Sequence, residues 1–117
     1  MLLAHAIVIA EARSYIAALA DAATTVHASV AYDRALIYLD SVHGDAVPAL
    51  TDVPVGCSLT LYRLAQQTVT DLGTFGLDPL HIELTHAYLA DAWALDRGAG
   101  EHGVRVLPAW IDPTEPS

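Results

Sequence analysis

The first 43 residues, from Met1 to His43, contain neither glycine nor proline. A single helix over this stretch would be roughly 63 Å long, at about 1.5 Å per residue. A compact domain of about 100 residues has a radius of gyration of only about 13 Å, and the whole chain has 117 residues. The stretch therefore either bends back on itself or stays one rod that a second copy of the chain covers.

The bend is expected within the sequence ADAATTVHAS. Residues 24–26 are two threonines and a valine, whose β-branched side chains are less favourable inside a helix. An aspartate or threonine in this segment can also cap a new helix. We therefore predict helices near residues 2–20 and 25–43, the second ending before Gly44.

Two prolines and two glycines in residues 44–57 predict a loop. A helix is expected near residues 58–73, where apolar residues recur on one face and mostly polar residues lie opposite. An up-down-up-down order, with each helix antiparallel to the one before it, is the expected arrangement.

The last helix is expected near residues 79–97. Asp78 is a good N-cap residue and Pro79 a good first-turn residue, and the sequence GAG is expected to end the helix. Residues 98–117 then form an extended tail in which three prolines prevent further helix. The chain is thus predicted to be a single all-α domain. We expect a four-helix bundle, or a long-helix variant of one, with an extended, proline-containing C-terminal tail.

Composition supports this fold class. Alanine supplies 21 of the 117 residues, and aromatic residues make up only 7%. Alanine is the best helix former, and its small side chain lets helices pack closely. An all-helical domain with a core of alanine and aliphatic residues is therefore expected.

The charge is strongly acidic. Fourteen acidic residues face five arginines, there is no lysine, and the net charge is −9. Such a surface repels nucleic-acid phosphates and anionic lipid headgroups, so we expect neither nucleic acid nor a membrane as a partner. A second copy of the chain, in a homo-oligomer, or a basic or amphipathic protein segment fits better.

Cys57 is the only cysteine, so no internal disulfide can form and nothing indicates an oxidising compartment. We expect its thiol to be a small buried apolar group. The apolar start MLLAHAIVIA lacks the basic residues and cleavage site of a signal peptide. Glu11 interrupts it before the roughly 20 residues that a membrane span needs. The chain is therefore expected to be cytoplasmic.

Two histidines and a glutamate lie within six positions of the last predicted helix, at His81, Glu83 and His86. At about 100° per residue, His81 points away from the other two and cannot join them around one ion. Glu83 and His86 are three positions apart and face the same way. We expect them to form a solvated pair near the start of the helix.

The Glu-x-x-His spacing is also the one used by di-iron carboxylate bundles. Asp40 and His43 repeat it in a weaker form, and Glu11 and Asp71 could complete a ligand set. In an up-down-up-down bundle, however, the two pairs would lie at opposite ends, more than about 15 Å apart. We therefore predict no metal site and no cofactor.

Asp91 falls within the main apolar stripe of the last helix, beside Tyr88. A carboxylate in such a place is costly unless it is paired or hydrogen-bonded. One interpretation is a general base or ligand in a bundle cavity, acting with Tyr88, His86 and Glu83. The other is a structural pair with an arginine or a tyrosine hydroxyl, or a stripe whose edge is more exposed to solvent than the pattern indicates. Four residues of the second helix could line a pocket or edge the core: Tyr32, Asp33, Arg34 and Tyr38.

Arg97 and His102 have the Arg-x4-His spacing within RGAGEH. This six-residue stretch resembles the motif of HEPN-type ribonucleases, small helical proteins that dimerise around it. In that family a helix holds the motif, whereas glycine, alanine and glycine here predict a loop. The acidic chain also supplies no basic groove for RNA. We therefore do not assign the chain to that family.

These observations favour a non-catalytic protein-interaction or regulatory module that self-associates. The first and last predicted helices carry more apolar circumference than one contact face needs, and surplus apolar surface usually marks an interface. Trp93, Trp110 and Ile111 are the expected interface residues. The alternative is a small enzyme, or a ligand- or metal-binding bundle, with a cavity around Asp91.

Overall fold

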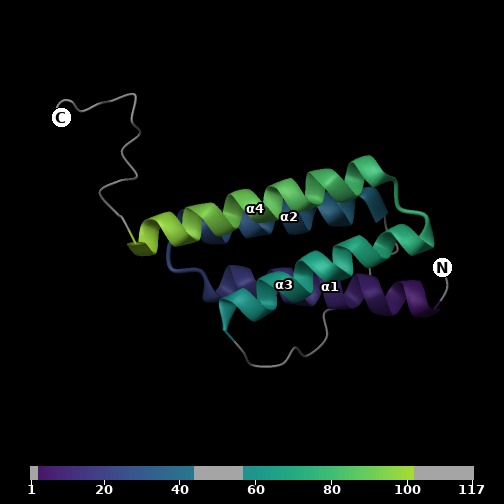
Figure 1. Cartoon of the computed structure of the whole chain (residues 1–117), viewed down its shortest axis with the longest axis horizontal. Helices are drawn as coiled ribbons and strands as arrows, with labels where there is room; N and C mark the ends of the chain where they lie inside the picture. The colour runs from purple at the N-terminus through teal and green to yellow at the C-terminus, as the bar shows by residue number, and fades with distance from the viewer. Residues whose placement is uncertain (1–2, 44–56, 102–117) are drawn as a thin grey trace.

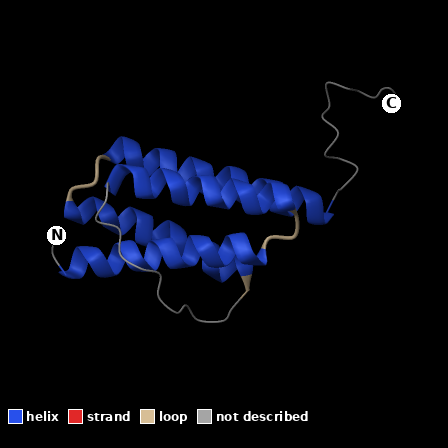
Figure 2. Ribbon diagram, turned by 180° about the vertical axis from the view of Figure 1, so that it is seen from behind, coloured by secondary structure: helices blue, strands red, loops and turns tan. Residues whose placement is uncertain are grey.

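The computed structural model describes residues 3–43 and 57–101, and the side chains of residues 98–101 lie outside this description. The described residues form four α-helices and one 3₁₀ turn, without a strand among them (Figures 1 and 2). The elements are α1 (Leu3–Ala22), α2 (Val26–His43), α3 (Ser58–Asp71), the 3₁₀ turn η1 (Leu72–Phe75) and α4 (Pro79–Glu101). The prediction of an all-α, four-helix fold is confirmed, while the predicted tail lies largely outside the described residues.

The first breaker-free stretch folds as two helices rather than one rod. The break falls at residues 23–25. The Thr25 hydroxyl oxygen accepts a hydrogen bond from the Ala28 backbone N–H at 3.1 Å, which caps the start of α2. The predicted bend was therefore placed within about a turn of where it occurs.

The start of α4 also follows its sequence signals. Gly76 has a φ of 94° and ends η1 in the left-handed conformation, which favours glycine. One carboxylate oxygen of Asp78 accepts a hydrogen bond from the Leu80 N–H at 2.8 Å, as expected of an N-cap residue. Together these residues turn the chain between α3 and α4.

The helices form two layers, with α1 beside α3 and α2 beside α4 (Figures 1 and 2). Among the described residues α1 also lies against α2, and α3 against α4, whereas the backbones of the two diagonal pairs stay farther apart. Tyr38 of α2 bonds to His81 of α4, and Thr24 bonds to Asp96, so α2 and α4 run antiparallel. The end of α2 and the end of η1 both lie by the start of α1, where His5 contacts His43 and Phe75. The four helices therefore run up, down, down and up.

This order corrects the expected up-down-up-down arrangement. That expectation assumed that α3 starts beside the end of α2, but the two helices run in the same direction and α3 starts at the opposite end of the bundle (Figure 1). The pairs Asp40–His43 and Glu83–His86 consequently lie at the same end of the bundle. The distance argument against a shared metal site was therefore wrong, and the contacts of these residues decide the question.

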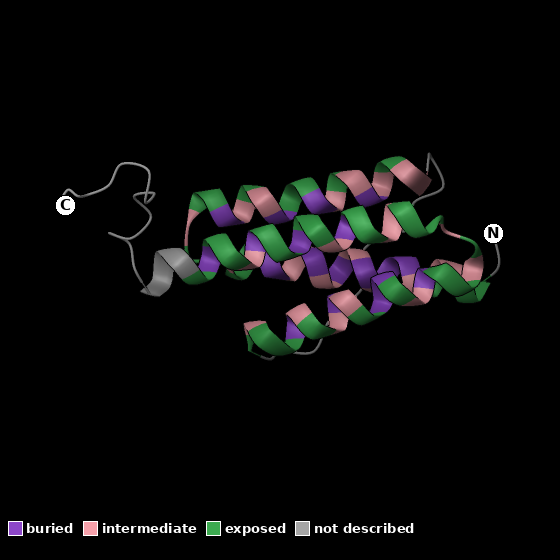
Figure 3. Ribbon diagram, turned by 45° about the horizontal axis from the view of Figure 1, so that its top comes forward, coloured by how far each residue is buried: buried purple, intermediate pink, exposed green. Residues whose placement is uncertain are grey.

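The core lies between the two layers and is built from aliphatic and alanine side chains around one buried tyrosine (Figure 3). Its largest fully buried side chains are Tyr32, Ile9, Ile16, Leu19, Leu39, Leu72, Leu89 and Val69. Alanines at helix contacts, such as Ala12, Ala35 and Ala65, are fully buried and let the backbones approach closely. The alanine-rich composition therefore serves packing in this fold.

The bundle buries the apolar stripe of α4 that contains Leu89 and Ala92. The other stripe, which includes Leu80 and Leu84, is exposed. The main apolar stripe predicted for this helix is thus not the core stripe, and Asp91 within it is exposed to solvent. Both stripes are apolar enough to be buried, so helical periodicity alone does not distinguish them.

The buried carboxylate of α4 is Asp96, which is only 5% exposed. One of its oxygens accepts hydrogen bonds from the Thr24 N–H at 2.9 Å and from the Thr24 hydroxyl at 2.7 Å. These charge-assisted bonds hold the α1–α2 turn against the far end of α4. Burial raises the pKa of the nearby Tyr32 hydroxyl to about 12, and the negative charge of Asp96 adds to that shift.

Two other sequence expectations are corrected. Helix α4 continues through GAG to Glu101, so residues 98–101 lie on the helix and not in the predicted loop. Cys57 is exposed at the N-terminal end of α3, with its sulfur 3.2 Å from the Thr60 hydroxyl, so it is not a buried apolar group. Among the described helices α1 alone is long and apolar enough to cross a membrane by length and composition, even with Glu11 in it. In the bundle this helix supplies part of the core.

The Asp96–Thr24 contact leads to a stability prediction. Asp96→Ala removes both bonds and leaves the Thr24 N–H without its acceptor, so the free energy of unfolding should fall by about 2–4 kcal/mol. Asp33→Ala, which removes an exposed carboxylate from α2, should change it by less than about 0.5 kcal/mol. Urea unfolding followed by circular dichroism measures both. Equal small effects of the two substitutions would contradict the assigned role of Asp96.

Candidate functional site

Exposed apolar side chains concentrate on one side of the bundle. Of the ten large apolar residues that are exposed within the described ranges, seven belong to the layer of α2 and α4. The seven are Val26, Val30, Ile37, Leu80, Leu84, Tyr88 and Leu95. Ile37 is 66% exposed and Leu80 is 57% exposed, while in Figure 3 the same two helices face the viewer with largely exposed outer sides. An apolar surface of this kind usually marks a binding site.

The exposed residues follow a regular spacing along each helix. On α4 the stripe contains Leu80, Leu84, Tyr88, Asp91 and Leu95. On α2 it contains Val26, Val30, Arg34, Ile37 and Ser41. Both stripes follow the same succession of steps, four, four, three and four residues, which is typical of helix faces that pack on another helix. We call the surface formed by these ten residues the α2/α4 face.

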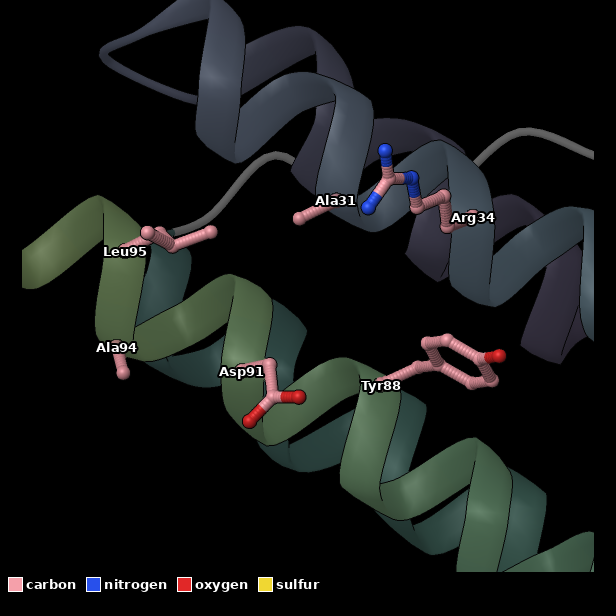
Figure 4. Close-up of a pocket in the computed structure, with 6 residues that line it drawn as sticks. All are labelled: Ala31, Arg34, Tyr88, Asp91, Ala94 and Leu95. Carbon is pink, nitrogen blue, oxygen red and sulfur yellow. The ribbon is translucent and has the colours of Figure 1, made fainter.

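A groove runs along the α2/α4 face between the two helices. Its larger part has a volume of about 510 Å³ and is lined by Ala31, Arg34, Tyr88, Asp91, Ala94 and Leu95 (Figure 4). A second part of about 270 Å³ continues past Arg34 and Tyr88 to Ile37, Tyr38 and Ser41. The Tyr38 ring supports this part, because it packs 5.3 Å from the Tyr88 ring and its hydroxyl bonds to His81 at 2.7 Å.

The groove carries one charge of each sign. Arg34 projects from α2 on one wall, and Asp91 projects from α4 on the other (Figure 4). Within the described part of the chain the only ion pair joins Arg13 to Asp40, at 2.8 Å. Arg34 and Asp91 are both exposed, and neither forms an ion pair with another described residue. Their charges are therefore available to an occupant of the groove.

The predicted cavity around Asp91 is only partly assembled. Asp91 and Tyr88 do line the groove, but it is an open surface feature and not a cavity inside the bundle. His86 points instead at α3, where its Nδ1 donates a hydrogen bond to Gln66 and its Nε2 lies 3.0 Å from the Thr70 hydroxyl. Glu83 is exposed and does not line the groove. The four residues therefore do not share one site.

The histidines of α4 each have a separate contact. His81 bonds to Tyr38 of α2, whereas His86 bonds to α3. Glu83 does not join His86 in these contacts. Across residues 3–43 and 57–101, no three histidine, cysteine or acidic side chains come close enough to hold a metal ion.

Asp40 and His43 also have separate contacts, although they lie at the same end of the bundle as α4's histidines. The Asp40 carboxylate accepts hydrogen bonds from the Arg13 guanidinium at 2.8 and 3.3 Å. His43 donates through Nδ1 to the Leu39 carbonyl oxygen at 2.8 Å. The remaining two di-metal candidates are also dispersed, since Glu11 belongs to α1 and Asp71 accepts a hydrogen bond from Gln67 on the surface of α3.

Two histidines meet where α1, α2 and η1 converge. The His5 ring stacks on Phe75 at 5.0 Å and meets the His43 ring edge-on at 5.7 Å. The Nε2 atoms of His5 and His43 are both buried without a hydrogen-bond partner among the described residues. Burial and the neighbouring His43 lower the pKa of His5 below its usual value of 6.5. Burial likewise lowers the pKa of His86.

The predicted interface tryptophan, Trp93, is engaged within the chain. Its ring stacks on Tyr62 of α3 at 4.5 Å, and the Arg97 guanidinium lies 4.1 Å from its ring centre. It therefore belongs to the α3–α4 contact and not to the α2/α4 face. Trp110 and Ile111 lie outside the described residues.

The sequence interpretation identified the α4 half of the α2/α4 face but took it for the core stripe. It placed Tyr88 and Asp91 on this stripe, whereas on α2 it named Arg34 alone as a possible pocket residue and did not identify the exposed aliphatic residues beside it. The available signal was that Val30, Arg34 and Ile37 on α2 have the same spacing as Tyr88 and its neighbours on α4. These two helices are adjacent in the structure. No local sequence pattern indicated that α2 and α4 are adjacent.

The lowered histidine pKa values predict destabilisation by acid. In the folded state His5 and His86 stay neutral at a pH where the unfolded chain, with pKa values near 6.5, binds protons. The free energy of unfolding should therefore fall as the pH drops below about 6.5, and these groups should add no slope above it. His5→Gln with His86→Gln should flatten the fall between pH 6.5 and 5.5 in urea titrations. His27→Gln, at an exposed position of α2, should leave it unchanged, and an equal flattening there would contradict the assignment.

Comparison with protein families, with curated proteins and with solved structures finds no match to this chain. The function is therefore inferred from the geometry of its own residues.

Proposed function

We propose that the protein is a non-catalytic interaction module that self-associates through the α2/α4 face in the cytoplasm. The observation that carries the proposal is the concentration of exposed aliphatic and aromatic side chains on two adjacent helices. Removing a leucine- or isoleucine-sized side chain from water contributes about 1.5–3 kcal/mol. Several such side chains on one continuous surface supply a favourable free energy of association.

Several polar side chains outside this face hold the helices of the bundle together. Asp96 holds the α1–α2 turn, Arg13 ties α1 to α2 through Asp40, and His86 joins α4 to α3. Each contact links two elements of the bundle. This pattern fits a rigid scaffold that presents a surface, because the ionisable groups at its helix contacts are used for packing.

A second candidate function is the binding of a small ligand in the groove. The groove's volume of about 510 Å³ lies within the range of ligand sites, and Arg34, Asp91 and Tyr88 place polar groups along its lining. A thermal-shift screen tests this function. A ligand that raises the melting temperature of the wild-type chain and not of Asp91→Ala would support it over self-association alone.

Self-association should be visible by sedimentation equilibrium at micromolar concentrations. The wild-type chain should show a dimer or a higher oligomer, whereas Ile37→Glu and Leu84→Glu should weaken association at least about tenfold. The reason is that each places a charge on a surface that loses water on contact. Leu59→Glu, at an exposed leucine of α3, is the matched control and should associate as the wild type does.

The dependence of binding on ionic strength distinguishes self-association from the binding of a basic partner. Two copies that each carry −9 repel over long range, so added salt should strengthen self-association up to about 0.3 M. Binding of a basic protein segment should instead weaken with salt. A wild-type chain that stays monomeric at all concentrations and salt levels tested would contradict self-association.

A further inference from the structure

We infer that the occupant of the α2/α4 face is a second copy of the chain, related by a two-fold axis along the groove, with Arg34 of each copy paired to Asp91 of the other. The inference rests on the proposed function and specifies its interface. It is carried by the spacing of the two stripes and by the placement of the two charges.

The two stripes suit helical partners. Each follows the four-four-three-four spacing that packs side chains of one helix between those of another. Helices α2 and α4 lie side by side and run antiparallel. A surface made of two such seams is matched by another pair of adjacent helices, and a second copy supplies that pair with the same spacing.

A two-fold axis along the groove exchanges the two walls. It places α2 of one copy over α4 of the other, and α4 over α2, so that each contact occurs twice. The α2 wall carries Arg34 and the α4 wall carries Asp91 (Figure 4). The same operation therefore brings each cation towards the anion of the other copy.

The charges also distinguish a second copy from other occupants. A basic segment would be attracted by Asp91 but repelled by Arg34. An acidic segment would be attracted by Arg34 but repelled by Asp91. A wholly apolar helix would remove water from both charges without pairing either, which is costly. The face of a second copy offers one charge of each sign, and the groove as a whole is neutral although the chain carries −9.

A charge-reversal cycle tests this arrangement. Arg34→Asp and Asp91→Arg should each weaken dimerisation at least about tenfold in sedimentation equilibrium, because the symmetry makes two like-charge contacts in each case. The double variant should regain dimerisation to within about threefold of the wild type. Both residues are exposed in the single chain, so each variant should keep its helical circular dichroism spectrum.

Mixing the two single variants is the sharper experiment. One variant then carries two negative charges in its groove and the other two positive charges. The mixed dimer restores both pairs at once, so equimolar mixing should recover dimerisation that neither variant shows alone. The controls are Asp33→Arg on α2 and Arg63→Asp on α3, both exposed and outside the groove. Mixed with each other or alone, they should dimerise as the wild type does.

The outcomes separate this inference from the proposed function. If the wild type dimerises but the single reversals do not weaken it, or mixing does not recover it, the two-fold pairing is wrong while self-association stands. If the wild type is monomeric, the proposed function itself fails. Should a reversal variant not fold, Arg34→Gln and Asp91→Asn remove each charge without reversing it, and each should then weaken dimerisation by a smaller factor.

Discussion

Helix α4 carries two apolar stripes, and a bundle of four helices can bury only one of them. The buried carboxylate of Asp96 lies on the stripe with Leu89 and Ala92 and must reach its hydrogen-bond donors at Thr24. With that stripe inside, the one through Leu80 and Leu84 faces outward. The polar anchor thus fixes the rotation of α4, and the exposed apolar face follows from that rotation.

The chain order determines what this outward stripe lies beside. Because the helices run up, down, down and up, α4 packs antiparallel on α2, and the outer stripe of α2 joins it to form one surface. In the simpler alternating order the neighbours of α4 would have been α3 and α1. The same order gathers His5, His43, His81 and His86 towards one end of the bundle, where His5 and His43 meet and His81 and His86 each bond to a neighbouring helix.

Local signals predicted the elements well. The bend near Thr25, the N-cap at Asp78 and the helix class all depend on interactions within one or two turns, which the sequence displays directly. The choice between the two stripes of α4, and the crossing from α2 to α3, depend on contacts between distant segments. Asp91 shows the consequence: its place on an apolar stripe was identified correctly, but that stripe faces solvent. The carboxylate that the bundle buries is Asp96. No local sequence pattern distinguished it, because its hydrogen bonds to Thr24 join segments that are far apart in the chain.

The acidic surface and the neutral groove have complementary effects. A net charge of −9 keeps copies of the chain apart in most orientations, because most approaches bring like charges together. The groove of the α2/α4 face holds one cation and one anion among apolar side chains, so it adds no net charge to this repulsion. The proposed dimer therefore combines an apolar seam, which supplies a driving force for association, with a balanced pair of charges, which favours one orientation.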